Sequence, residues 1–257
     1  MTLPRRSRVW LFDLDNTLHD ASFAAFGPTN AAMNDYIVEH LALDLDLDGA
    51  ARLRQHYWNH YGATLLGLVR HHGVKASHFL YETHRLPGLE ARLRTSLHDR
   101  AVLKRLRGRK FILTNAPRAY AMRVLNTLRL ADCFDGVISI EDMMMFGHLR
   151  PKPDARMFAY VLARLKVRAS DCVLIEDTLE HQKAARSLGM HTVWMQRYLE
   201  GRYPGPAWRG RNKALPPAEK TASKTAKNVP EVGVHPCRKP PYVCAKMKSL
   251  QRLFEFQ

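Results

Sequence analysis

The sequence predicts an α/β protein with a Rossmann-like, doubly wound parallel sheet core and a helical cap inserted after the first strand. Five short apolar runs alternate with segments of helical periodicity, which is typical of a parallel sheet covered by helices. The runs are nearly continuous in apolar residues, as expected for strands buried on both faces. With 257 residues the chain is long enough for one sizeable core that carries an insert.

The apolar runs place the strands of the core. They lie at 9–14, 110–115, 136–140, 172–177 and 191–195. Helical periodicity predicts the intervening helices at 117–130, 153–167 and 179–190.

The first strand is followed by a long stretch without a convincing second one. Between Asp20 and about Arg107 the sequence looks only helical, and we interpret residues 22–96 as the cap. A cap at this position would lie over the carboxyl end of the first strand, where open α/β sheets bind ligands.

The remaining segments complete the expected organisation. Residues 201–240 are rich in Pro, Lys, Gly and Ala and lack periodicity, which predicts a disordered basic insertion. The expected domains are therefore 1–21 and 97–200 for the core, 22–96 for the cap, 201–240 for the insertion, and 241–257 for a closing strand and helix of the core.

Composition is that of an ordinary globular protein, with 46% hydrophobic and 25% charged residues. No apolar run approaches the roughly 18–20 residues of a membrane span. The basic start is interrupted by Asp13 and is followed by no small-residue cleavage site, so a signal peptide is not expected. We therefore expect a cytoplasmic protein without a membrane partner.

The formal net charge of +16 is unevenly placed. From Gly201 onward there are twelve Lys and Arg against three Glu. Such a cluster can attract polyphosphate, which leaves open a polyanion-binding protein, nucleic acid included, as an alternative of another class. The segment lacks the interleaved aromatic residues of a stacking surface, which favours a solubilising insertion instead.

Polar residues end three of the predicted strands, at the edge where the carboxyl ends of a parallel sheet meet. They are Asp13 and Asp15, Thr114 and Asn115, and Glu176 and Asp177, with Lys152 just before a predicted helix. Because ligands of doubly wound sheets bind beyond these ends, we expect all seven side chains to line one crevice.

The residue types in this crevice indicate a metal and a phosphate. Neighbouring carboxylates repel one another unless a hard cation such as Mg²⁺ lies among them. Thr114 and Asn115 precede a helix start marked by Pro117, which would offer hydroxyl, amide and backbone N–H groups to an anion. Lys152 would balance the charge of a phosphoryl group. A carboxylate not fully occupied by metal could attack phosphorus and form an aspartyl-phosphate.

The chain has D-x-D-x-T after an apolar strand, a Thr at the end of the next strand, a Lys near a helix start and a pair of acids ending a fourth strand. These four motifs, in this order, resemble those of the haloacid dehalogenase-like phosphatases, and the resemblance spans about residues 8–196. Several stretches are more closely similar to the pyrimidine 5′-nucleotidase subgroup of bacteria and fungi. They are "FDLDNTLH", "YGATLLGLVRHHG", "LTNAPRAYAMRVL", "RPKPDARMF", "IEDTLEHQKAA" and the final "YVCAKMKSLQRL".

The resemblance implies a role for each motif residue. Asp13 would be the nucleophile and Asp15 the general acid/base, a second acid that the dehalogenase branch lacks. Mg²⁺ would be held by Asp13, Asp177 and the backbone carbonyl of Asp15, with Glu176 acting through a water. Thr114, Asn115 and Lys152 would hold the phosphoryl oxygens. His181 departs from the subgroup, which often has Asn at this position.

The implied function is a Mg²⁺-dependent phosphomonoester hydrolase that releases nucleoside and phosphate from pyrimidine nucleoside monophosphates. Tyr57, Tyr61 and Thr64 of the predicted cap offer flat faces and polar tips with which a base could be selected. Because the cap would set selectivity, phosphoglycolate or a sugar phosphate remains an alternative substrate for the same chemistry.

Overall fold

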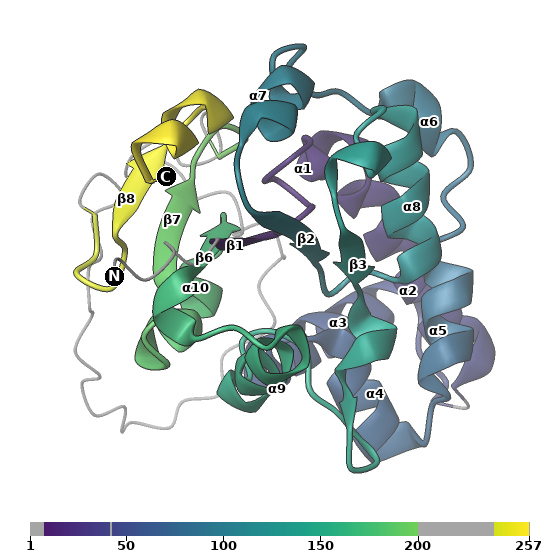
Figure 1. Ribbon diagram of the computed structural model, residues 1–257. Helices are drawn as coiled ribbons and strands as arrows, with labels where there is room; N and C mark the ends of the chain where they lie inside the picture. Colours follow the sequence, from purple (N-terminus) through teal and green to yellow (C-terminus); the bar gives the residue numbers. More distant parts are fainter. Residues whose placement is uncertain (1–7, 42, 200–238, 257) are drawn as a thin grey trace, which may run out of the picture.

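A computed structural model describes residues 8–41, 43–199 and 239–256. Its centre is a sheet of six parallel strands in the order β3-β2-β1-β6-β7-β8 (Figure 1). The strands are β1 (Val9–Phe12), β2 (Arg109–Leu113), β3 (Gly136–Ile138), β6 (Cys172–Glu176), β7 (His191–Met195) and β8 (Ala245–Met247). The predicted doubly wound parallel sheet is confirmed.

Helices cover both faces of this sheet. They are α7 (Asp99–Arg105) and α8 (Arg118–Thr127) on one face, and α9 (Ala155–Leu165) and α10 (Leu179–Ser187) on the other. Trp10 and Phe12 of β1 pack with the first pair, whereas Val9 and Leu11 pack with the second. All four side chains are fully buried, which explains why the first strand is apolar at every position.

The connection between β1 and β2 is helical, as predicted. It contains α1 (Ala21–Ala24), α2 (Phe26–His40), α3 (Leu47–Tyr61), α4 (Thr64–His72), α5 (Ala76–Thr83) and α6 (Leu89–Arg92). Helices α2 to α5, here called the helical cap, share an apolar cluster of their own around Ile37, Leu68 and Phe79. They are grouped at one end of the molecule, away from β8 (Figure 1). We propose 22 and 96 as the limits of the whole insert.

The hairpin of α3 and α4 shows how local sequence shapes the cap. The Asp46 side chain accepts a hydrogen bond from the backbone N–H of Gly49 at 2.7 Å and so caps α3. The helix ends at Gly62, whose φ of 76° lies in the left-handed region. A Cβ on Gly67 would lie 2.2 Å from the Tyr57 ring, so only glycine permits this approach of α4 to α3.

One small hairpin was not predicted, and the predicted closing helix has 3-10 geometry. A small antiparallel hairpin, β4 (Met144–Met145) with β5 (His148–Leu149), turns at Phe146 and Gly147, both with positive φ. Strands of two residues are too short to show a periodicity. After β8 the closing helical element is a 3-10 helix, η5 (Leu250–Phe256).

The predicted basic insertion at 201–240 lies, except for its last two residues, outside the described residues. Among the residues that are described, no helix combines the length and the apolar character that a membrane crossing requires.

Candidate active site

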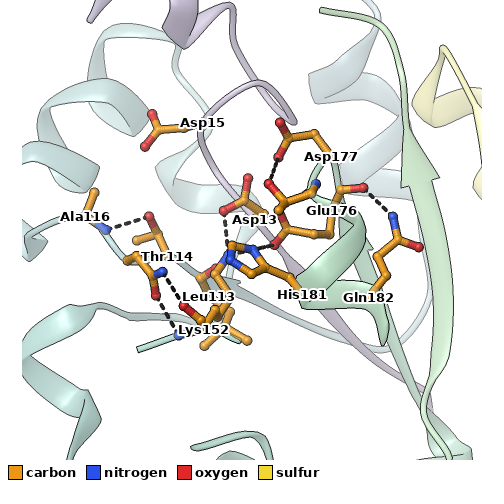
Figure 2. A network of polar contacts seen from close by, with 12 residues as sticks. Asp13, Asp15, Leu113, Thr114, Ala116, Lys152, Glu176, Asp177, His181 and Gln182 are labelled. Carbon is orange, nitrogen blue, oxygen red and sulfur yellow. Dashed lines mark hydrogen bonds and ion pairs between the residues drawn. The ribbon is translucent and has the colours of Figure 1, made fainter. Parts of the chain in front are cut away.

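The carboxyl ends of β1, β2 and β6 bring the predicted motif residues together. The register places Phe12 beside Ile112 and Ile175, so the residues that follow the three strands emerge next to one another. Lys152 reaches the same place from the loop before α9. Figure 2 shows Asp13, Lys152, Glu176 and Asp177 as one polar network, with Thr114 beside it.

Lys152 is the centre of this network. Its side chain is 1% exposed, and Nζ donates to Asp13 Oδ1 at 2.7 Å, to Glu176 Oε2 at 2.7 Å and to the Leu113 carbonyl at 2.9 Å. All three donors of the ammonium are therefore used. Burial alone would lower the pKa of Lys152, but the two carboxylates raise it above its ordinary value. The buried lysine is thus charged.

The three carboxyl groups around Lys152 differ in their electrostatics. Burial, reinforced by repulsion from Glu176, raises the pKa of Asp13 to about 7, although Lys152 opposes the change. Burial and the Glu176 carboxylate also raise the pKa of Asp177 well above its usual value. Burial disfavours the charged form of Glu176 as well, yet Lys152 and His181 hold its pKa below the ordinary range. One lysine therefore does not neutralise all three acids.

These acids fit a hard divalent cation. One oxygen each from Asp13, Glu176 and Asp177 lie within 4.8 Å of one another. A site that offers only carboxylate oxygens suits Mg²⁺. Glu176 Oε2 is held by Lys152, and Oε1 accepts from the Thr178 backbone N–H at 3.1 Å. Because both Glu176 oxygens are engaged, Asp13 and Asp177 are better placed to bind the ion directly.

Asp15 lies apart from the cluster around Lys152 (Figure 2). Its Oδ1 accepts a hydrogen bond from the Tyr120 hydroxyl at 2.7 Å and pairs with His19 Nε2 at 2.9 Å. Burial, aided by the Asp15 carboxylate, raises the pKa of Tyr120 well above its ordinary value, so the hydroxyl is a donor.

Sequence reasoning missed both partners of Asp15. His19 stands four residues after Asp15, and Tyr120 lies in the first turn of the helix that follows Asn115. Both residues lie close to motif residues in the sequence, and this proximity is the signal that could have identified them.

Thr114 and Asn115 directly follow β2, which ends at Leu113, and their side chains already have partners. Thr114 Oγ1 accepts from the backbone N–H of Ala116 at 3.0 Å. The Asn115 amide bonds the backbone of Lys152 twice, accepting from its N–H and donating to its carbonyl, each at 2.9 Å. Asn115 therefore positions Lys152, and its predicted contact with a phosphoryl oxygen would come from its backbone N–H.

His181 lies directly against the acid cluster. Its Nδ1 is 3.2 Å from Glu176 Oε2, and its side chain is 16% exposed. The neighbouring Gln182 donates to the Glu176 carbonyl at 2.8 Å. The residue at which this chain departs from the pyrimidine nucleotidases thus contacts Glu176 itself.

The three candidate selectivity residues of the cap have different surroundings. Tyr57 and Thr64 are buried, and their hydroxyls bond His72 and the Arg54 carbonyl inside the cap. The Tyr61 hydroxyl also bonds inside the cap, to His71 Nε2 at 2.5 Å, but Tyr61 in addition lines a cavity of about 260 Å³ together with Leu66 and residues 149–154. Of the three, Tyr61 alone lines this cavity, which includes the loop of Lys152.

Known proteins match this sequence and fold. The family described as haloacid dehalogenase-like hydrolase matches residues 8–189. Phosphate metabolism protein 8 of Saccharomyces cerevisiae is 26% identical over 201 residues, which cover 72% of this chain and 60% of that protein. A phosphoglycolate phosphatase of Nitrosospira multiformis is 31% identical over 91 residues, which cover 35% of this chain and 38% of that protein. The chain thus matches less than two thirds of either curated relative.

The fold is shared with solved structures. A HAD phosphatase from Thermococcus onnurineus superimposes with a TM-score of 0.58 at 18% identity, over 97% of both chains.

Proposed function

Because the chain belongs to the haloacid dehalogenase-like hydrolase family, we propose that it is a Mg²⁺-dependent phosphomonoester hydrolase working through an aspartyl-phosphate on Asp13. The observation that carries this proposal is the cluster of buried Asp13, Lys152 and Glu176 with half-buried Asp177 at the strand ends. It supplies a nucleophile, a cation and an oxygen-only metal site at one place.

The proposed reaction has two steps. A carboxylate oxygen of Asp13, oriented by Lys152 through Oδ1, attacks phosphorus, and the ester P–O bond breaks while Asp15 protonates the leaving oxygen. Water then attacks the aspartyl-phosphate, Asp15 accepts its proton, and phosphate leaves. Thr114 and the Asn115 N–H would hold the phosphoryl oxygens, and Lys152, whose three N–H groups already have partners, would contribute through its positive charge or by giving up one of these contacts. Bound Mg²⁺ would offset the negative charge shared by phosphate and Asp13.

For the substrate, we propose pyrimidine nucleoside monophosphates. Support comes from the motif stretches shared with pyrimidine 5′-nucleotidases and from Tyr61, whose ring lines the cavity beside residues 149–154. A flat aromatic face there could stack on a base. The similarity to a phosphoglycolate phosphatase makes phosphoglycolate the second candidate. The polyanion-binding alternative depends on the insertion at 201–240, of which the structure describes only 239–240.

A substrate panel tests the proposal. We expect kcat/KM in Mg²⁺ to be higher for UMP, CMP and dTMP than for AMP, GMP, phosphoglycolate and hexose phosphates. EDTA should abolish turnover of every substrate, and added Mg²⁺ should restore it, because the acids of the site offer only oxygen ligands.

The outcomes of the panel separate the levels of the proposal. Equal rates on purine nucleotides, or a preference for phosphoglycolate, would contradict the pyrimidine nucleotidase proposal but not the phosphatase proposal. Undiminished turnover in chelated buffer would contradict the proposed dependence on Mg²⁺. Hydrolysis of none of the monoesters would contradict the enzyme itself.

A further inference from the structure

Asp15 is held by two side chains, His19 and Tyr120, to which the family resemblance assigns no role, although both lie within the quoted motif stretches. Tyr120 donates its hydroxyl hydrogen to Asp15 Oδ1 at 2.7 Å, and His19 Nε2 lies 2.9 Å from the same oxygen. The Tyr120 hydroxyl is also 3.5 Å from His19 Nε2, so the three groups form a closed triangle. The carboxyl is therefore fixed through one of its two oxygens.

Two of the three side chains in this triangle are shielded from solvent. Tyr120 is 2% exposed and His19 is fully buried, whereas the Asp15 side chain keeps 21% of its surface exposed. Among the described residues, both side-chain contacts of Asp15 are made by Oδ1. This leaves Oδ2 as the oxygen that would exchange a proton with a substrate.

Tyr120 is itself rigidly placed. Its ring belongs to the apolar cluster between the sheet and α8, and it meets the His84 ring edge-on at a centroid distance of 5.7 Å. His84 stands at the end of α5, where the chain leaves the helical cap, and His19 stands where the chain departs toward it. Tyr120 thus contacts residues of both connections to the cap.

We propose that Tyr120, together with His19, is a positioning residue for Asp15. The two contacts on Oδ1 orient the carboxyl so that Oδ2 delivers its proton to the leaving ester oxygen. This inference rests on the proposed function, in which Asp15 is the general acid/base.

The effect of losing the Tyr120 hydroxyl on kcat/KM should therefore depend on whether the leaving group needs a proton to depart. The alkoxide of an alkyl ester such as UMP is a poor leaving group and needs the proton in the transition state. 4-Nitrophenolate leaves without it. A merely structural role of Tyr120 would affect both substrates alike.

The test is Tyr120→Phe, which removes the hydroxyl and keeps the buried ring. We expect kcat/KM for UMP, or for phosphoglycolate if the panel favours it, to fall by about 10- to 100-fold. The kcat/KM for 4-nitrophenyl phosphate should change by less than about threefold, because this ratio reports the steps up to formation of the aspartyl-phosphate. Equal losses on both substrates, or no loss on the alkyl ester, would overturn the inference.

A matched control and a double variant complete the experiment. Tyr36→Phe removes another buried hydroxyl, one that bonds His78 inside the cap. It should leave kcat/KM unchanged for both the alkyl ester and 4-nitrophenyl phosphate. If Tyr120 acts through Asp15, adding Tyr120→Phe to Asp15→Asn should cause no further loss on the alkyl ester. Additive losses would contradict this coupling. If Tyr120→Phe does not fold, His19→Asn, which removes the other contact, must give the same leaving-group dependence.

Failure of the proposed function has its own signature. Asp15→Asn should lower kcat/KM for the alkyl ester far more than for 4-nitrophenyl phosphate. If Asp15→Asn spares the alkyl ester, Asp15 is not the general acid. If Asp15→Asn is impaired while Tyr120→Phe matches the wild type, only the positioning role fails.

Discussion

A single ammonium group allows two acids to be buried side by side at the end of the sheet. Lys152 touches Asp13 and Glu176 at 2.7 Å while almost fully buried, so each charge loses water but gains a partner. Removing one member of a buried ion pair leaves an uncompensated charge, which costs more than the pair contributes. At the scale of the residue, the site is therefore also a determinant of stability.

The first prediction follows from this pairing. Lys152→Met, measured by urea unfolding in EDTA, should lower the free energy of unfolding by about 3–5 kcal/mol, because Asp13 and Glu176 lose their cation. Adding Glu176→Gln should recover part of the loss, since one unpaired charge is then removed. If the single variant unfolds at the wild-type midpoint, the ion pairs do not have this role.

At the scale of the element, strands and site were largely predictable for the same reason. The apolar run of a strand buried on both faces ends where polar residues begin, so β1 ends at Phe12, just before Asp13, and β6 ends at Glu176, one residue beyond the apolar Ile175. Parallel strands then bring the acids at their carboxyl ends together, so a prediction of the sheet also predicts the position of the site.

Contacts between elements could not be predicted in this way. The bond between Tyr120 and Asp15 joins residues 105 positions apart and depends on how α8 packs against the sheet. Periodicity shows which face of a helix is buried, but not which neighbour a buried hydroxyl meets. The internal partners of Tyr57 and Thr64 likewise depend on how α3 and α4 pack.

The cap helices carry the second prediction. Tyr61→Ala should reduce the kcat/KM preference for UMP over AMP more than it slows hydrolysis of 4-nitrophenyl phosphate, because the Tyr61 ring lines the cavity and takes no part in the chemistry. Tyr81→Ala is the matched control, since Tyr81 is a cap tyrosine that is 64% exposed. An unchanged UMP-to-AMP ratio in Tyr61→Ala would mean that base selection lies elsewhere.

At the scale of the whole molecule, the sheet carries the proposed catalytic groups, and the helical cap meets the loop that holds Lys152. Strands β1, β2 and β6 bring the proposed nucleophile, phosphate-binding residues and metal ligands together through one register. The cap has its own apolar cluster, which is joined by Ile140 of the core. The proposed catalytic groups thus come from the core, while Tyr61 comes from the cap.

The most direct test of the central claim is to trap the covalent intermediate. The protein is mixed with substrate and Mg²⁺, quenched in acid, reduced with borohydride and sequenced by tandem mass spectrometry. Because borohydride reduces an acyl phosphate to an alcohol, we predict homoserine at position 13, and none in Asp13→Asn, which should fold but lose at least about a hundredfold in kcat/KM. Homoserine at another aspartate, or Asp13→Asn activity within tenfold of wild type, would contradict Asp13 as the nucleophile.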